Sequence, residues 1–275
     1  MVDVVIVGSG MAGLTAALYA GRYELKALVI GHEFGGATST AWTVENYPGF
    51  KSIDGYDLMM KVKEQVEALG AKIVSDKIVK IEKIETGYDL TGKSGEHYEA
   101  KTLLFANGAA RRKLGLPKEG EFAKGKGVHY CTTCDGPLYK GKTIGVVGSG
   151  DASVKGMNLA VQYAEKIYSI VRGDKLKAEP INYSRLEPHL GHKVEILFKT
   201  KVEELLGDSR LTAVKLSDGR ELALDGLFVE IGAVPEVEIA QEIGVILDEY
   251  GYIAVDNEMK TNVEGIFAAG DVTNF

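Results

Sequence analysis

The sequence predicts an α/β protein built from two doubly wound, Rossmann-like dinucleotide-binding domains. Two glycine-rich turns, residues 8–13 and 148–153, each follow a short apolar strand and open a helical stretch. This strand–turn–helix order is the opening of a βαβ unit, and its second occurrence is the one internal repeat in the chain. With 275 residues, the chain is long enough for two domains of usual size.

The first half of the chain carries the first βαβ opening. Apolar, β-branched runs predict strands, and apolar residues at helical spacing predict helices. Leu14, Ala17, Leu18 and Gly21 share one face of the helix that follows the first turn. A second helix is expected over residues 56–69, with lysines and glutamates opposite its apolar face. The strands expected here cover residues 2–7, 27–30, 72–75, 80–84 and 102–106.

The same pattern restarts near residue 143. A short β-branched strand again leads into a glycine turn, and a helix is expected over residues 152–164. Shorter apolar runs separated by turn residues follow, and these predict further strands. The strands expected in this part cover residues 143–147, 166–171, 194–198, 211–216 and 226–231.

Composition and charge exclude several classes of protein. A net charge of −7 without any basic cluster argues against nucleic-acid binding. No apolar run reaches the roughly 18 residues that a membrane helix needs, and the N-terminus lacks the basic region of a signal peptide. The 34 glycines, with only 6 prolines, indicate close backbone approaches rather than disorder. Two cysteines are too few for a disulfide scaffold, so we expect a cytoplasmic protein without membrane contact.

The first glycine turn predicts a dinucleotide site. Gly8 permits the tight turn, Gly10 lets the backbone approach a pyrophosphate, and Gly13 allows close packing of helix on strand. The helix N-terminus then faces the anion. The acidic residue that usually binds the ribose is missing at the end of the second strand. Glu33 lies close to that position, but we interpret it as a solvated loop residue.

The second glycine turn is a looser match, because Ser153 replaces the third glycine. Arg172 follows about twenty residues later, where NADP-dependent enzymes place an arginine. With Lys177 nearby, this favours a 2′-phosphate, although a lone arginine at a strand end is often incidental. The residues expected at this site are Gly148, Gly150, Asp151, Arg172 and Lys177.

The two cysteines, Cys131 and Cys134, form a CxxC motif. Two intervening residues hold the sulfur atoms close enough for a disulfide ring that can open and close. A zinc site would need four ligands, and the histidines at 189 and 192 lie far outside zinc-finger spacing, so we expect no metal. Asp135 follows directly, and from its position it is equally well a proton donor or a turn residue.

Five motifs, in order along almost the whole chain, resemble those of the low-molecular-weight thioredoxin reductases. The first turn is similar to the FAD site of that family, and residues 131–136 are similar to its CATCDG redox segment. The other three motifs are Gly35-Gly36 followed by VENYPG at residues 44–49, FANGA at residues 105–109, and the terminal stretch at residues 261–271 that ends in AAGD.

This resemblance implies a discontinuous FAD-binding domain, residues 1–110 and 234–275, and an inserted nicotinamide domain, residues 111–233, that carries the cysteines. Electrons would pass from a donor through FAD and the disulfide to thioredoxin or a similar small protein. Cys134 would face the flavin, Cys131 would attack the partner disulfide, and Asp135 would act as acid and base. The resemblance also implies a homodimer. The FAD-binding residues that it implies are Gly8, Ser9, Gly10, Met11, Ala12, Gly13, Gly35, Gly36, Asn46, Gly108, Gly270 and Asp271.

Family members rotate the inserted domain, so that the flavin meets the nicotinamide and the disulfide in turn. The short links at residues 109–113 and 233–236 would then be hinges.

Three departures from the family pattern bear on function. Val171-Arg172-Gly173 lacks the second arginine of the family's NADPH users, so NADPH, NADH or reduced ferredoxin could each be the electron donor. Ala37 replaces a usual glutamine, and the sequence stops four residues after Asp271, where the family continues with a helix that faces the flavin. The alternative functions are a non-catalytic flavin-binding redox sensor and an electron donor to a different redox partner.

Overall fold

The computed structural model describes residues 1–274, and the chain divides into two compact units. Unit 1 comprises residues 1–110 together with the chain from Pro235 onward, and unit 2 comprises Arg111–Val234. Each unit contains a largely parallel sheet, one strand of which leads into a glycine turn and a helix. The predicted α/β class with two Rossmann-like folds is therefore confirmed.

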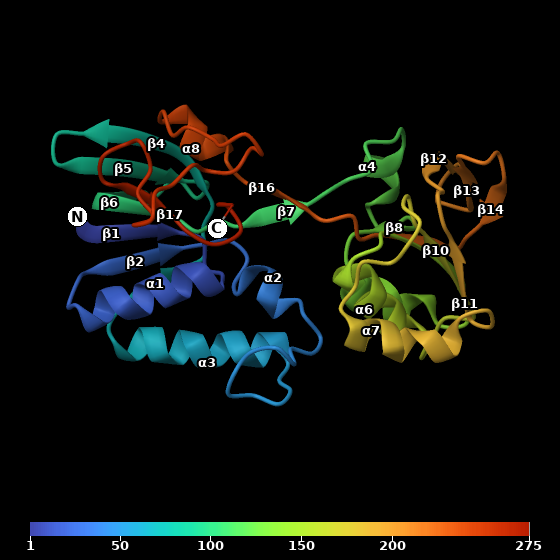
Figure 1. The fold of residues 1–275 in the computed structure, drawn as a ribbon. Coiled ribbons are helices and arrows are strands. Elements are labelled where there is room, and N and C mark those ends of the chain that lie inside the picture. Colours follow the sequence, from blue (N-terminus) through green and yellow to red (C-terminus); the bar gives the residue numbers. More distant parts are fainter. Residues whose placement is uncertain (275) are drawn as a thin grey trace. The chain divides into compact units, whose positions relative to one another are not determined.

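The sheet of unit 1 has the strand order β3-β2-β1-β6-β5-β4, and β17 pairs with the last part of β6 (Figure 1). The pairs among β3, β2, β1, β6 and β17 are parallel, whereas β4, β5 and β6 form antiparallel pairs. The strands are β1 (Val2–Val7), β2 (Ala27–Ile30), β3 (Lys72–Val74), β4 (Ile78–Ile84), β5 (Gly87–Gly92), β6 (His97–Phe105) and β17 (Ile266–Ala268).

Helices α1 (Met11–Arg22) and α3 (Gly55–Ala68) pack against each other on one face of this sheet (Figure 1). Their apolar sides are buried with β1 and β2 in one core cluster, as the helical spacing of the sequence predicts. Asp54 begins α3 by accepting hydrogen bonds from two first-turn N–H groups. The short helices are α2 (Gly36–Ser39) and α8 (Glu238–Glu242), the latter beside β4.

Unit 2 contains a parallel sheet of order β11-β10-β9-β15-β8 and a separate antiparallel sheet of order β12-β13-β14. The central strands β9 and β15 are buried on both faces and read as nearly continuous apolar runs. The strands are β8 (Val128–His129), β9 (Thr143–Val147), β10 (Lys166–Ile170), β11 (Val194–Leu197), β12 (Val202–Leu206), β13 (Ala213–Leu216), β14 (Glu221–Ala223) and β15 (Gly226–Val229).

The helices of unit 2 are mostly short. Only α6 runs for ten residues, and it packs beside α7 (Figure 1). The two chain segments that connect the units, β7 (Ala109–Arg111) and β16 (Ala233–Pro235), pair with each other. The helices are α4 (Glu119–Phe122), α5 (Thr132–Asp135), η1 (Gly136–Tyr139), α6 (Asp151–Ala160), α7 (Pro180–Leu186) and η2 (Glu187–His189), where η denotes a 3₁₀ helix.

The predicted elements differ from the structure in several places; for example, β12, β14 and α7 were not predicted, and β6 begins five residues before the strand expected over 102–106. The helix expected over residues 152–164 ends at Ala160, because the N–H groups of Gln162 and Tyr163 turn to the carbonyls three residues back. Strand β5 was not predicted, since glycines at both its ends read as turn residues. Among residues 1–274, no helix is both long and apolar enough to cross a membrane.

Candidate functional site

The first glycine turn connects β1 to α1, and two of its glycines are sterically required. Gly8 has a φ of +116°, and its N–H donates to the Ile30 carbonyl at 2.7 Å. A Cβ on Gly8 would lie 2.2 Å from the Ala106 carbonyl oxygen, at the end of β6. A Cβ on Gly13 would lie 2.0 Å from the Gly8 carbonyl oxygen. Any side chain at these positions would therefore push the helix off the sheet.

Gly10, by contrast, faces open space. It is the N-cap residue of α1, and a Cβ there would meet no atom within 4 Å. No side chain caps α1. Its first turn begins with Met11 and Ala12 and contains no acidic residue. The first N–H groups of a helix have no intrahelical acceptor and attract anions. This uncapped end with an open cradle fits the pyrophosphate of a dinucleotide such as FAD.

Several predicted residues gather around this helix end. Ser9 is buried, and its Oγ donates to the Glu33 carbonyl while its own carbonyl accepts from the Gly35 N–H at 3.0 Å. Gly36 lies against the turn, because a Cβ on it would be 3.5 Å from the Gly10 Cα. Gly270 is equally close, since a Cβ there would lie 2.7 Å from that of Ala12.

The structure shows no such close contact with the first glycine turn for the remaining predicted residues of unit 1. Asp271 follows Gly270 and is exposed, between neighbours that pack into the unit. Gly108 adopts a φ of +72° and its carbonyl accepts from the Glu236 N–H. Asn46 is exposed in the loop between Val44 and Ile53, and no hydrogen bond between it and the turn is found among residues 1–274. Glu33, set aside in the sequence analysis, contacts the turn through its backbone.

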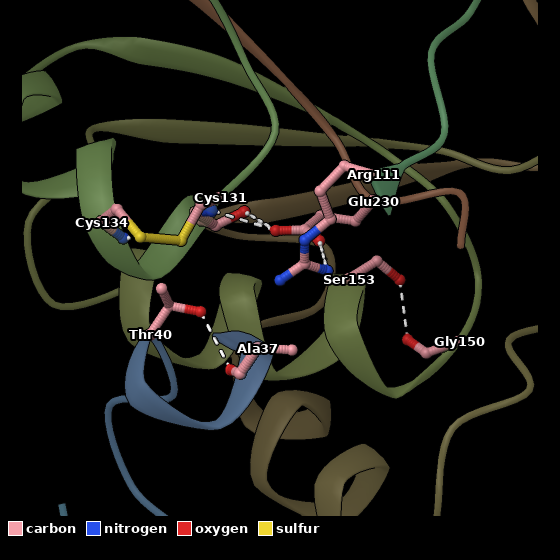
Figure 2. Close-up of polar contacts among 9 residues, drawn as sticks. Ala37, Thr40, Arg111, Cys131, Cys134, Gly150, Ser153 and Glu230 are labelled. Atoms are coloured by element: carbon pink, nitrogen blue, oxygen red, sulfur yellow. Dashed lines mark hydrogen bonds and ion pairs between the residues drawn. A yellow bond between two sulfur atoms is a disulfide. The ribbon is translucent and has the colours of Figure 1, made fainter. Parts of the chain in front are cut away.

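The second glycine turn, between β9 and α6, repeats this construction in unit 2. Gly148 has a φ of +142° and donates to the Ile170 carbonyl, and a Cβ on it would lie 2.2 Å from the Glu230 carbonyl oxygen. Gly150 again faces open space. Ser153 replaces the third glycine, and its buried Oγ donates to the Gly150 carbonyl at 2.8 Å (Figure 2). The serine therefore fits because its hydroxyl is satisfied within the turn.

Asp151 connects the second turn to the segment that follows β10. Its Oδ1 accepts from the Glu179 N–H at 2.9 Å and from Asn182 Nδ2 at 2.7 Å. Partial burial would raise the pKa of Asp151, but these hydrogen bonds and the charge of Lys155 hold it below its ordinary value. The structure thus gives this carboxylate a positioning role in addition to its place in the turn.

The residues expected at a 2′-phosphate lie on the same segment. The Lys177 N–H donates to the Ser149 carbonyl at 2.6 Å, which holds the segment against the turn. The side chains of Arg172 and Lys177 are both exposed. This segment therefore presents the guanidinium of Arg172 and the ammonium groups of Lys175 and Lys177 to solvent.

Cys131 and Cys134 form a disulfide at the N-terminus of α5, with an S–S distance of 2.12 Å (Figure 2). The Cys134 N–H donates to Cys131 Sγ at 3.1 Å. Cys134 is exposed and Cys131 half-buried, so one sulfur is open and the other is supported by protein. The predicted redox pair is thus present in its oxidised form.

Glu230 supports this disulfide from the end of β15, and the sequence analysis missed it. Its Oε1 accepts from both the N–H and Oγ of Thr132 at 3.0 Å, and its Oε2 lies 3.5 Å from Arg111 Nη1 (Figure 2). The Glu230 side chain is only 5% exposed, so these partners satisfy its buried oxygen atoms. An acidic residue directly after an apolar, four-residue buried strand was the available signal.

Asp135 is held by a second group that the sequence analysis missed. His129 Nδ1 lies 2.9 Å from Asp135 Oδ2, and His129 Nε2 lies 2.7 Å from the Tyr139 hydroxyl. The imidazole stacks on Phe228 at 5.1 Å between ring centroids. A histidine two residues before the CxxC motif was the only signal in the sequence. Among residues 1–274, no group of three potential ligands could hold a metal ion.

Comparisons with known proteins agree with this geometry. Residues 2–275 match the family described as pyridine nucleotide-disulphide oxidoreductase. The thioredoxin reductase of Listeria innocua is 40% identical over 277 residues, which cover 98% of this chain and 85% of the relative. The crystal structure of Lactococcus lactis thioredoxin reductase has a TM-score of 0.92 at 33% identity, covering 100% of this chain and 91% of that one.

A ferredoxin-flavin thioredoxin reductase from Clostridium acetobutylicum is also similar. Its crystal structure has a TM-score of 0.50 at 32% identity and covers 100% of this chain and 90% of that one.

Proposed function

The chain belongs to the pyridine nucleotide-disulphide oxidoreductase family, and from this premise we propose that it reduces the disulfide of thioredoxin or a similar small protein. The relatives confirm the resemblance to the low-molecular-weight thioredoxin reductases. The observation that carries the proposal is the disulfide between Cys131 and Cys134 within a chain that also presents an uncapped dinucleotide turn. A flavin-dependent reductase requires both features.

Unit 1 is the proposed FAD-binding domain. The open cradle at Gly10 and the uncapped N-terminus of α1 support a pyrophosphate there, and Gly270, which precedes Asp271, lies against Ala12 at the same helix end. FAD bound in this way would supply the two-electron chemistry that connects a donor to the disulfide. The proposed ligands are the residues predicted from the family motifs, including Gly35, Gly36, Asn46 and Gly108.

The roles proposed for the three residues of the redox segment come from the resemblance to the family. Reduction breaks the S–S bond and leaves two thiols, of which one must attack the partner disulfide as a thiolate. We assign the attack to Cys131, electron exchange with the flavin to Cys134, and proton transfer to Asp135. The adjacent carboxylate supports this assignment, because each half-reaction moves protons as well as electrons.

Unit 2 is the proposed nicotinamide domain, with NADPH as the donor. The second glycine turn offers Gly148 and Gly150 to a pyrophosphate, and Arg172 and Lys177 are the cations available for a 2′-phosphate. A lysine cannot replace a bidentate arginine fork. We therefore expect weak discrimination between NADPH and NADH.

Reduced ferredoxin is the second candidate donor. The similarity to a protein named as a ferredoxin-flavin thioredoxin reductase supports it, and so does the missing second arginine at residue 173. Anaerobic stopped-flow reduction with NADPH, NADH and reduced ferredoxin in parallel separates these candidates. Fast flavin reduction by NADPH with NADH far slower would contradict our expectation of weak discrimination.

The cysteine mechanism is tested with Cys134→Ser. This variant should keep bound FAD and its yellow colour but lose multiple-turnover reduction of thioredoxin. Thr133→Ser, a change of similar size between the two cysteines, is the matched control and should retain activity. Retained turnover in Cys134→Ser would refute the mechanism, and a single reduction of the wild type without turnover would identify a redox sensor instead.

The proposal also includes a homodimer in the cytoplasm, where small disulfide proteins are kept reduced. Size-exclusion chromatography with light scattering on the flavin-loaded protein measures the oligomeric state directly. A monomer at micromolar concentration would remove the dimer from the proposal.

A further inference from the structure

A buried hydrogen-bonded chain runs from Tyr139 through His129 to Asp135. His129 is 8% exposed, whereas the side chain of Asp135 is 40% exposed. This series of hydrogen bonds is therefore buried at Tyr139 and His129 and reaches solvent at Asp135, the residue next to Cys134. Three separate elements, β8, α5 and η1, contribute one residue each.

The hydrogen bonds determine which imidazole nitrogen carries the proton. A carboxylate has only acceptor sites, so Nδ1 of His129 donates to Asp135 Oδ2. In the neutral ring Nε2 is then an acceptor, and the Tyr139 hydroxyl donates to it. Burial, together with the charges of Asp135 and Asp225, raises the pKa of Tyr139 against the opposing effect of Arg210. The phenol thus stays protonated and keeps the tautomer in place.

The ring itself is fixed by packing. It stacks on Phe228 of β15 at an interplanar angle of 23° and meets the Tyr139 ring edge-on at 5.3 Å. The charged and titratable groups that face this cluster are Asp135 on α5, Tyr139 on η1, and, around Tyr139, Arg210 and Asp225.

We infer that His129 is a positioning residue for the redox pair, which holds the Asp135 carboxylate in the orientation that exchanges protons with the cysteines. Tyr139 supports it by locking the imidazole tautomer. The inference rests on the proposed function, because it gives Asp135 the acid and base role there. His129 acts only through Asp135 and touches neither sulfur in this assignment.

The proton balance shows what this arrangement does. When a dithiol reduces the Cys131–Cys134 disulfide, the S–S bond breaks, two electrons move to the protein sulfurs, and the reductant closes into its own disulfide. The two protons of the reductant end on the two cysteine sulfurs. Asp135 takes up and releases the proton that passes to the leaving sulfur, while the Nδ1–H of His129 stabilises its charged form.

The test measures reduction of this disulfide by dithiothreitol in the full-length, flavin-loaded protein between pH 5 and 9. The reaction is quenched with iodoacetamide and the alkylated cysteines are counted by mass spectrometry. His129→Phe should slow reduction by at least about tenfold near neutral pH, a fraction of the total effect of acid–base catalysis. The rate should be low over the whole pH range, because the carboxylate is no longer held in one orientation by the imidazole.

His129→Asn is the rescue variant. Its Nδ2 can donate near the position of Nδ1 but cannot titrate in this range, so the rate should stay within about threefold of wild type if positioning is the role. His97→Phe is the matched control, because His97 Nδ1 makes the same 2.9 Å contact with a carboxylate, that of Asp89, in unit 1. It should leave the rate and the profile unchanged.

A double-mutant cycle tests whether His129 acts through Asp135. In an Asp135→Asn background, His129→Phe should cause no further slowing, since its partner is already gone. Equal slowing in both backgrounds, an unchanged rate in His129→Phe, or no rescue by asparagine would each overturn the inference. If His129→Phe does not fold, Tyr139→Phe takes its place; slower reduction is expected, and a wild-type rate would overturn the inference.

The assay also separates this inference from the proposed function. Dithiothreitol reduction needs neither an electron donor nor thioredoxin. A wild-type protein that fails to turn over thioredoxin, but shows the predicted cycle with dithiothreitol, would contradict the proposed function and support the role of His129.

Discussion

At the scale of single residues, the two glycine turns use their glycines for two different purposes. Gly8 and Gly13 are glycine because backbone atoms lie within 2.2 Å of where a Cβ would be. Gly10 and Gly150 are not restricted by the protein, since a Cβ on either would meet nothing within 4 Å. The space beside them is explained by a ligand that approaches the helix N-terminus. Within each turn, the glycines that the protein itself requires can thus be told apart from the one that leaves room for a ligand.

This difference gives a paired prediction. Gly10→Ala should leave the fold intact, because the new methyl group meets no protein atom, yet weaken FAD binding by at least about tenfold. Gly150→Ala is the matched variant in unit 2 and should retain FAD while weakening nicotinamide binding. Fluorescence titration of apoprotein with FAD, and circular dichroism for the fold, measure both effects. Normal FAD affinity in Gly10→Ala would contradict the proposed site.

At the scale of elements, the redox segment depends on close packing of α5 and η1 against α6 and its C-terminal turn. A Cβ on Gly156 of α6 would lie 2.8 Å from that of Thr132, and one on Gly136 would lie 1.8 Å from the Tyr163 hydroxyl. Burial raises the pKa of that hydroxyl to about 12, and no partner for it is found among residues 1–274. Small residues therefore let the disulfide helix sit directly on α6.

The contact between Gly136 and Tyr163 is testable by a second mutation. Gly136→Ala should destabilise the protein by about 1–3 kcal/mol through overpacking. Tyr163→Phe removes the nearest atom, so it should recover part of this loss, and alone it should cost little because the hydroxyl has no partner. Urea unfolding measures all three variants. Gly120→Ala, at a helical position with open space, is the control and should change stability by only tenths of a kcal/mol.

At the scale of the whole molecule, the chain is two units with separate cores. The core clusters of unit 1 lie around β1, β6 and α1, whereas those of unit 2 lie around β9, β15 and α6. The chain leaves unit 1 at Ala110 and returns at Pro235, so unit 1 is assembled from both ends of the sequence. Separate cores permit separate unfolding.

We therefore predict that FAD stabilises the two units unequally. A ligand that binds the native state stabilises it by about 2.7 kcal/mol at a concentration of 100 times its Kd. If FAD binds unit 1, adding FAD to the apoprotein should raise the unfolding temperature of unit 1 and leave that of unit 2 near its original value. NADPH should instead raise the unfolding temperature of unit 2. Calorimetry measures both transitions. A shift of only the unit 2 transition by FAD would reverse the domain assignment.

The sequence by itself determined the features that are local along the chain. The bounds of β1, β2 and β9 agree with the predicted strands, because β-branched apolar runs between turn residues define such strands without help from distant segments. The positions of both glycine turns and the CxxC pair were equally readable, since each is a short motif. These features were enough to predict the fold class and the family.

Only the tertiary structure decided which side chains support the redox pair. Glu230 meets Thr132 across 98 residues of sequence, and His129 of β8 lies with Nδ1 2.9 Å from the carboxylate of Asp135, six residues later in α5. No local pattern marks such contacts, because a buried acid or histidine is satisfied by whichever partners the folded chain brings to it. The motif was therefore visible in the sequence, whereas the groups that hold its carboxylate and its helix in place were not.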